Sequence, residues 1–429
     1  MSTTDSERMR WSVGARANTP PPEPASRPPE QSVPDEIVEA ADEPTGFNPD
    51  AAWLTEALPP NVAMLCVTGS TWHGEPSFQL HFHYRHKVRA AARDSDLAVQ
   101  RPSKLSLPMR AEQVERTAPT EQPWRKAYEA VMSWWAPMAK LTMWTRELIA
   151  ADDNPKLIIW DNTDHEIPWE LVHHRRSDGR GPIGWLGELV PIIRWTAIHD
   201  GERAWYYSAE GRRCLGGLLM MEDPSLSTKP DSFARYEIDP RTTTVDELMI
   251  KLDDPSHRFG LLLLRCHGKY SGDASEFTLG GKALNAYTEY TMDALRESGA
   301  LVVLNACGSG RPAIDQRYHG APTRSFAELF LRYGAGGVIA TVGEVDLNHS
   351  HDFAVRLLEN ARAQDLNIAE ALQQHRRYYA QLARRKRGQS ESRTERDFEL
   401  FFSSFMYVYF GHPDTVLRTD SLPRGGGAR

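Results

Sequence analysis

The stretch FGLLLLRCHG, residues 259–268, decides the fold class of this 429-residue chain. Its four consecutive leucines predict a short strand buried on both faces, which is typical of a parallel sheet covered by helices on both sides. The strand stops at Cys266, His267 and Gly268. Because chemistry in such sheets lies at the carboxyl ends of the strands, this strand end is expected to belong to a functional site.

The C-terminal half repeats this pattern of apolar strands separated by helices. LGGLLMME (215–222), ALVVLNAC (300–307) and GGVIATV (336–342) predict three more buried strands, SFMYVYFG (404–411) is expected to close the sheet, and FTLGGKALN (277–285) predicts a hairpin. Helices are expected over 245–253, 290–298, 324–334, 349–363 and 368–387, with caps at Thr244, Glu247, Gly299, Asn367 and Glu370. The alternation predicts an α/β fold with a largely parallel sheet and helices on both faces.

The N-terminal half is less regular but also mixes strand and helix signals. Strands are expected over 61–69, 78–86, 156–160 and 184–197, and a helix over 124–150. Pro137 should kink or split that helix, and Pro168 should begin a helical turn. Pro191 implies an edge position or a bulge for the last of these strands. This half therefore predicts an α/β enlargement of the C-terminal sheet.

The amino-acid composition restricts the classes of protein to which the chain can belong. With 40% hydrophobic and 25% charged residues the chain is typical of a soluble globular protein, and it has no apolar run of the roughly 20 residues that a membrane span needs. The N-terminus lacks a secretory signal, which favours the cytoplasm. A net charge of -8 argues against nucleic acid as a partner. Four regions are predicted: a disordered Pro/Ser/Glu-rich segment (1–50), an N-terminal α/β region (51–205), a peptidase domain (206–416) and a flexible tail (417–429).

Metal and disulfide chemistry find little support in the sequence. The four cysteines are scattered and form no CxxC pair, so each is either core filling or a nucleophile. His81 and His83 would share a strand face, but no carboxylate or cysteine lies nearby to complete a metal site. Cys266 should point to the opposite face from His267, into the core. No metal and no cofactor are expected.

His267 and Cys307 end two of the predicted buried strands. If these strands are adjacent and parallel, both side chains meet at one rim of the sheet. The imidazole can then take the thiol proton, and the thiolate can attack a carbonyl carbon to form an acyl-enzyme. The N–H groups of Gly268 and Cys307 are placed to form an oxyanion hole. A lone strand-end cysteine is more often core packing, but the pair CHG and NACGSG favours catalysis.

These motifs resemble a known family. LLLLRCHG, ALVVLNACGSG, GAGGVIATVGEVD and FMYVYFGHPDTV, with HEIPWELV upstream, are similar to the CHAT family of caspase-like cysteine peptidases over residues 156–416. The resemblance implies a caspase-like fold, His267 as general base, Cys307 as nucleophile and Gly268 as an oxyanion donor. The region before residue 150 resembles a degenerate first half of an enlarged caspase-like unit.

The expected substrate specificity rests on acidic residues near the rim. In peptidases of this clan an acidic residue there often selects a basic P1 side chain, and the candidates are Asp273, Glu344 and Asp346, with the last two as the leading pair. Solvated loop acids are the alternative interpretation. The loop ARRKRGQSESRTER (383–396) offers many arginines, so an always-active enzyme with this preference should cut itself. An intact chain therefore implies latency.

The resemblance implies a cysteine endopeptidase with a protein or peptide substrate. It further implies latency until a protein partner or a nucleotide signal arrives, in bacterial defence or cell death. Most tryptophans of residues 124–205 should fill the core, although one or two would suit a nucleotide pocket. Two alternatives stay open: a catalytically idle caspase-like scaffold that binds, and a small-molecule acyl-transfer enzyme with the same dyad. An intact His267 and Cys307 argue against the first, and only the motifs argue against the second.

Overall fold

The computed structural model describes the folded part of the chain in segments. It covers residues 59–72, 75–84, 87–88, 99–100, 123–134, 139–151, 154–161, 167–174, 183–195, 198–200, 203–205, 211–226, 232–313, 325–385 and 395–419. The expected disordered segment 1–50 and most of the expected tail lie outside these residues. The proposed domain boundaries stay predictions.

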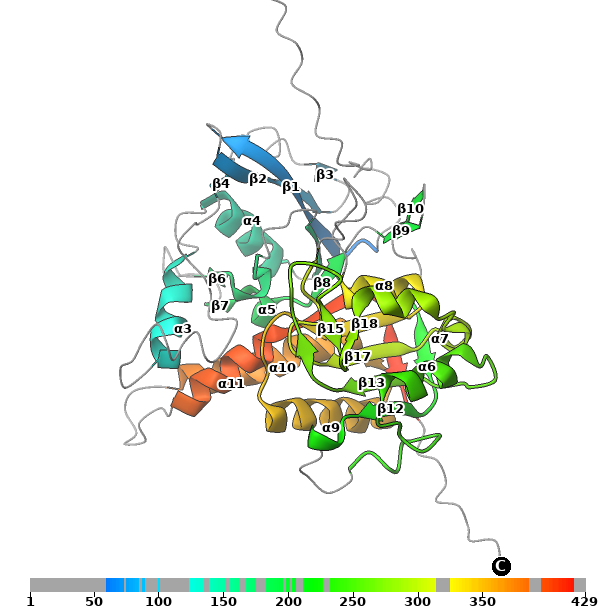
Figure 1. The fold of residues 1–429 in the computed structure, drawn as a ribbon. Coiled ribbons are helices and arrows are strands. Elements are labelled where there is room, and N and C mark those ends of the chain that lie inside the picture. The colour runs from blue at the N-terminus through cyan, green and yellow to red at the C-terminus, as the bar shows by residue number, and fades with distance from the viewer. Residues whose placement is uncertain are drawn as a thin grey trace, which may run out of the picture. The chain divides into compact units, whose positions relative to one another are not determined.

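A single sheet runs through both halves of the described chain (Figure 1). Its strand order is β12-β13-β17-β18-β20-β8-β5-β1-β2-β3, with β4 paired to β2. The strands are β1 Val62–Trp72, β2 Glu75–Tyr84, β3 Lys87–Val88, β4 Val99–Gln100, β5 Lys156–Asp161, β8 Ile192–Trp195, β12 Leu218–Glu222, β13 Leu261–Arg265, β17 Leu301–Asn305, β18 Gly337–Thr341 and β20 Tyr407–Gly411. The leucine run at 261–264 lies in β13, which pairs in parallel with β12 on one side and β17 on the other.

Alternate residues of β13 face two different helical layers. Leu262 and Leu264 belong to a core cluster with residues of α6–α8, whereas Leu261 and Leu263 belong to one with residues of α9 and α10. This double burial explains why the strand carries leucine at every position. The helices are α3 Pro123–Trp134, α4 Ala139–Ile149, α5 Leu186–Leu189, α6 Val245–Asp253, α7 Asp293–Ser298, α8 Phe326–Arg332, α9 Leu347–Ala363, α10 Ile368–Arg384 and α11 Glu395–Met406.

The predicted fold class is confirmed. β12, β13, β17 and β18 are mutually parallel, as are β1, β5 and β8, and helices cover both faces. The strand expected over 404–411 begins at Tyr407, because residues up to Met406 form the last turns of α11. It pairs antiparallel with β18 and lies inside the sheet, between β18 and β8, rather than at its edge.

Most capping signals are also confirmed. Thr244 and Glu247 form the capping box of α6, and the Asn367 side chain accepts the Glu370 N–H at the start of α10. Gly299 adopts the left-handed conformation that ends α7. The expected hairpin is β15 Thr278–Leu279 with β16 Lys282–Ala283.

The interpretation of Pro191 was wrong. The expected strand over 184–197 divides into β7 Gly184–Trp185, the short helix α5 and β8, and Pro191 lies directly before β8. Its missing N–H therefore removes no ladder bond, while its carbonyl accepts the Leu157 N–H at 2.9 Å. β8 can then lie in the sheet interior, between β20 and β5.

The HEIPWELV element joins the two halves of the molecule. Pro168 begins a short 3-10 turn, Trp169–Leu171, as expected. The buried carboxylate of Glu170 binds Arg194 of β8, with 2.9 Å between Oε1 and Nε. Burial alone would raise the pKa of Glu170, but Arg194 and the nearby Arg376 of α10 hold it below its usual value. An ionised carboxylate therefore links β8 to the helical layer.

Four of the described tryptophans of this region lie in the core, and Trp124 and Trp144 pack half-buried against it. Trp160, Trp169, Trp185 and Trp195 are all buried, and the indole N–H groups of Trp169 and Trp195 donate to Asp161 and to the Gly411 carbonyl. These four rings are therefore part of the core. None of the described helices is long and apolar enough to span a membrane.

The remaining strands form short accessory sheets. They are β6 His173–His174 with β7, β9 Ile198–Asp200 with β10 Arg203–Trp205, β14 Gly268–Lys269 with the β15–β16 hairpin, and β11 Arg213–Leu215 with β21 Val416–Arg418 and β19 Leu366–Asn367. The β14–β16 sheet follows directly on His267 and so lies at the rim of interest.

Candidate active site

The register of β13 and β17 brings His267 and Cys307 to one rim. Arg265 and Asn305 are partners across the two parallel strands, and the histidine and the cysteine each follow two residues later. His267 is exposed and Cys307 is half-buried. The imidazole and the thiol therefore follow the ends of two neighbouring parallel strands at one rim of the sheet.

Gly268 has a more specific reason to lack a side chain than the sequence suggested. A Cβ at this position would overlap the Cys307 carbonyl oxygen and lie 3.1 Å from the Cys307 backbone nitrogen. The backbone contact shows that the histidine strand and the cysteine loop touch each other here, which fixes the spacing of the two functional groups.

The cysteine sits in a turn that hydrogen bonds hold against β18. The Gly308 N–H donates to the Gly343 carbonyl at 3.3 Å, and the Gly310 N–H donates to the Thr341 carbonyl at 2.8 Å. The Thr341 hydroxyl donates to the Ala306 carbonyl at 2.6 Å. Ser309 is buried, and its hydroxyl accepts the Thr341 N–H. Cys307 is thus carried on a rigid turn.

Buried polar groups form hydrogen bonds and ion pairs at the strand ends that precede the rim. Arg265, at the end of β13, pairs with Glu222 at the end of β12, and Arg241 binds the same carboxylate at 2.6 Å. At the end of β17, the Asn305 amide donates to the Ser350 carbonyl and accepts from the Tyr407 hydroxyl, each at 3.1 Å. These contacts fix the last residue of each strand before the dyad.

Cys307 differs from the other three cysteines in its surroundings. Burial raises the pKa of Cys66, Cys214 and Cys266 to about 12. These groups are therefore thiols at neutral pH and are shielded from solvent. Cys266 packs in the cluster with Leu264 and Ala306, on the opposite face from His267, as strand alternation requires. Only Cys307 combines a rim position with access to solvent.

The three candidate specificity acids have different surroundings. The Asp273 carboxylate accepts from the Ser275 N–H at 2.8 Å and hydroxyl at 2.7 Å, which builds a turn in the loop after β14. Glu344 is half-buried and directly follows Gly343, the residue bonded to Gly308. Asp346 caps α9 and forms an ion pair with Arg396 of α11, at 3.0 Å between Oδ1 and Nη2.

The pairing changes the character of Asp346. Burial alone would raise the pKa of this carboxyl, but the hydrogen bonds from Arg396 and from the His349 N–H bring it below its usual value. The carboxylate that was expected to receive an arginine of the substrate therefore already holds an arginine of the chain itself. The sequence predicts a loop over 383–396, whereas Arg396 lies in the first turn of α11 and can therefore reach Asp346.

Two further polar residues lie at the rim that the sequence analysis did not single out. Asp223 and Ser225 follow β12, and the Ser225 hydroxyl lies 3.1 Å from His267 Nε2. The signal was present in the sequence, since LGGLLMME was read as a buried strand and EDPS continues past its end. The same rule that selected His267 and Cys307 applies to this strand end.

The metal interpretation gains no support within the described segments, where no three His, Cys, Asp or Glu side chains are grouped to hold an ion. His81 lies 3.3 Å from the Thr68 hydroxyl, and burial lowers the pKa of both His81 and His83. His86 lies outside the described residues.

Residues 227–412 match the family model of the CHAT domain. The expected family resemblance is thereby confirmed over this segment. It contains His267, Gly268 and Cys307, whereas Asp223 and Ser225 precede it. The caspase-like α/β fold implied by the domain agrees with the observed sheet. No curated protein matched the sequence.

Solved structures with a related arrangement include two crystal structures of the Saccharomyces cerevisiae separase–securin complex. Each has 10% sequence identity and a TM-score of 0.44, and the match covers 86% of this chain. It covers 31% of the matched chain, so this protein spans about a third of that relative's length.

Proposed function

We propose that this protein is a cysteine endopeptidase in which His267 and Cys307 act as one chemical unit. The observation that carries the proposal is the register of β13 and β17, which sets both residues two positions beyond the Arg265–Asn305 pair. The contact of Gly268 with the Cys307 backbone supports it, because that contact holds the two strand ends together.

The reaction has two steps, acylation of Cys307 and hydrolysis of the acyl-enzyme. His267 takes the thiol proton, Cys307 Sγ bonds to the scissile carbonyl carbon, and the tetrahedral oxyanion lies at the backbone N–H groups of Gly268 and Cys307. The intermediate collapses with cleavage of the C–N bond, and the leaving amine takes the proton from His267. Water, deprotonated by His267, then hydrolyses the thioester, releases the carboxylic acid and restores the thiol.

Glu344 and Asp346 form the wall that binds a basic P1 side chain. Their loop is adjacent to the cysteine turn through the Gly308–Gly343 hydrogen bond, and a carboxylate binds a guanidinium through two parallel hydrogen bonds. Arg396 holds Asp346 in this way. Latency is then built into the fold, since a partner or nucleotide signal has to move the first turn of α11 before a substrate arginine can bind.

A defence or cell-death role follows from latency, because a peptidase that waits for a signal suits a destructive response. The CHAT segment is the support for this assignment. The activator and the protein substrate are identified by chemistry only: a ligand that displaces Arg396, and a chain with an accessible arginine or lysine.

Cleavage of a random peptide library by the Arg396→Ala protein, in which Asp346 is free to bind a substrate, tests the proposal when new termini are read by mass spectrometry. We expect cleavage after Arg and Lys, abolished in Cys307→Ala and His267→Ala because both residues act in one unit. Cys266→Ala should keep most activity, since its side chain is core. A Cys307→Ala protein that cleaves normally would remove the nucleophile assignment, and cleavage after Asp or apolar residues would remove the P1 assignment.

A further inference from the structure

The turn after β12 places a carboxylate and a hydroxyl in line with the candidate catalytic histidine. The Asp223 N–H extends the β12–β13 ladder by donating to the Arg265 carbonyl at 2.9 Å. Asp223 Oδ1 accepts from the Ser225 N–H at 2.9 Å and from the Ser225 hydroxyl at 2.7 Å. That hydroxyl lies 3.1 Å from His267 Nε2. The three side chains form one hydrogen-bonded chain.

The direction of this chain follows from counting protons. A serine hydroxyl has one hydrogen, and an ionised carboxylate accepts only. The hydrogen bonds from Ser225 lower the pKa of Asp223, and the nearby His267 adds to this effect, so Asp223 is ionised at neutral pH and Ser225 donates to it. The remaining contact then needs a donor on the histidine side, which is Nε2–H.

We propose that Asp223 and Ser225 are positioning residues that hold His267 as the Nε2–H tautomer, with Nδ1 left unprotonated to take the proton of Cys307. This inference rests on the proposed function, in which His267 is the base. It adds to the dyad a two-residue relay, carboxylate to hydroxyl to imidazole. Fixing the tautomer of a catalytic histidine is worth up to about 10⁴ in rate elsewhere.

A second copy of the same tripeptide provides an internal comparison. Asp254, Pro255 and Ser256 repeat the sequence Asp-Pro-Ser and the same turn, with the Ser256 N–H donating to Asp254 Oδ1 at 2.9 Å. This copy precedes β13, whereas the histidine follows it. The turn is therefore a common local structure, and its position against His267 gives the first copy its role.

The rate at which iodoacetamide alkylates Cys307 in the full-length protein tests the relay without substrate or activator. Ser225→Ala and Asp223→Ala should each slow the reaction about tenfold at pH 7, because the imidazole loses the partner that orients it. Ser225→Thr keeps the hydroxyl and should restore the rate. Ser256→Ala removes the matched hydroxyl and should alkylate as fast as the wild type. Peptide mass spectrometry assigns the modified thiol.

A spectroscopic measurement separates the relay from a merely structural role. In protein labelled with ¹⁵N-histidine, the ring nitrogens of His267, assigned by their loss in His267→Ala, should show a protonated Nε2, and Ser225→Ala should mix the tautomers. A wild-type alkylation rate in Ser225→Ala, or a protonated Nδ1 in the wild type, would overturn the relay. Unchanged alkylation in His267→Ala would instead overturn the dyad on which the proposed function rests.

Discussion

The two ends of β18 show how differently one sheet uses its polar residues. At the carboxyl end, the Thr341 hydroxyl holds the cysteine turn. The polar groups next to this turn are either accessible to solvent or held in ion pairs that can open. At the amino end, Gly337 pairs with Gly411, so the turn His412–Thr415 lies beyond it. Polar groups there serve to fasten separate segments together.

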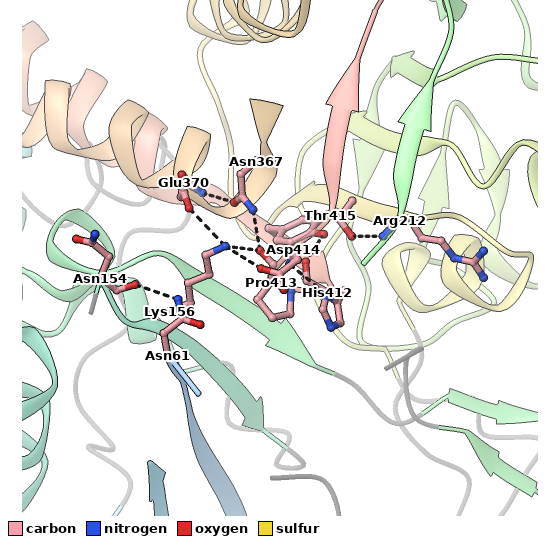
Figure 2. Close-up of polar contacts among 11 residues, drawn as sticks. Asn61, Asn154, Lys156, Arg212, Asn367, Glu370, His412, Pro413, Asp414 and Thr415 are labelled. Carbon is pink, nitrogen blue, oxygen red and sulfur yellow. Dashed lines mark hydrogen bonds and ion pairs between the residues drawn. The ribbon is translucent and has the colours of Figure 1, made fainter. Parts of the chain in front are cut away.

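Lys156 is the centre of that second cluster (Figure 2). Its buried Nζ, at the start of β5, donates to the Pro413 carbonyl at 2.9 Å and lies 3.1 Å from Asp414 Oδ1 and 3.4 Å from Glu370 Oε1. Asn367 donates to the same Pro413 carbonyl. One ammonium thus joins the first half of the chain, α10 and the last turn of the sheet.

The comparison predicts that the rim is the acid-sensitive end. His349 and His375 lie with their Nε2 atoms 3.1 Å apart, behind Asn305 and Tyr407. Burial lowers the pKa of His349 to about 4, with Arg356 adding to the effect, and burial lowers that of His375 as well. The unfolded chain therefore binds more protons than the folded chain between pH 6.5 and about 4, so stability is lost as the pH falls through that window.

Denaturant unfolding at pH 7 and pH 4.5 measures this loss. We expect His349 to account for roughly 2 kcal/mol of the decrease, so that His349→Gln loses less stability on acidification than the wild type. If both proteins lose the same amount, the histidine pair does not make the rim acid-sensitive.

The variant Lys156→Met tests the role of the polar cluster at the amino end of β18. Removing the ammonium leaves Asn367 as the remaining donor to the Pro413 carbonyl and leaves Asp414 without its buried partner. This should lower the free energy of unfolding by about 2 kcal/mol, less than for a fully buried pair because both acids are half-exposed. The alkylation rate of Cys307 should not change, since the two clusters lie at opposite ends of β18.

Lys251 offers a matched control for Lys156. It also donates to a proline carbonyl, that of Pro240, and pairs with an aspartate, Asp239, but it lies on α6 and is less buried than Lys156. Lys251→Met should cost less than half as much. Equal costs for the two variants, or a slower Cys307 reaction in Lys156→Met, would contradict the division of roles between the two ends.

The rim was predictable because strand burial and strand ends are both visible in the sequence. Unbroken apolar runs before CHG and NACGSG placed His267 and Cys307 correctly relative to the sheet, and period-2 alternation separated Cys266 from His267. Short turns are harder to interpret. Asp-Pro-Ser occurs at 223–225 and at 254–256, and nothing local distinguishes the copy that reaches a histidine from the copy that does not.

α11 was missed for a related reason. FELFFSSFMYVYF (398–410) is mostly apolar and aromatic, and such a run does not show by its period where a helix stops and a strand begins. The boundary at Met406 is set by tertiary contacts, with Phe398, Phe401 and Phe405 packed against Trp185 and Tyr128. Without the helix, Arg396 had no position, and its pairing with Asp346 could not be inferred.

The ion pair between Arg396 and Asp346 gives the smallest of the effects that we expect. Arg396 is partly exposed and also binds Glu399 one turn on, at 2.8 Å, so it can leave Asp346 without losing every partner. Arg396→Ala should therefore raise the cleavage of arginine reporter peptides by the purified protein about tenfold, the size of a modest coupling between two sites, with little change in melting temperature. Arg258→Ala, which removes an exposed arginine paired with Glu297, should leave the rate unchanged. An Arg396→Ala protein no more active than the wild type would mean that the ion pair only fastens α11, and the rim would then resemble the opposite end of the sheet.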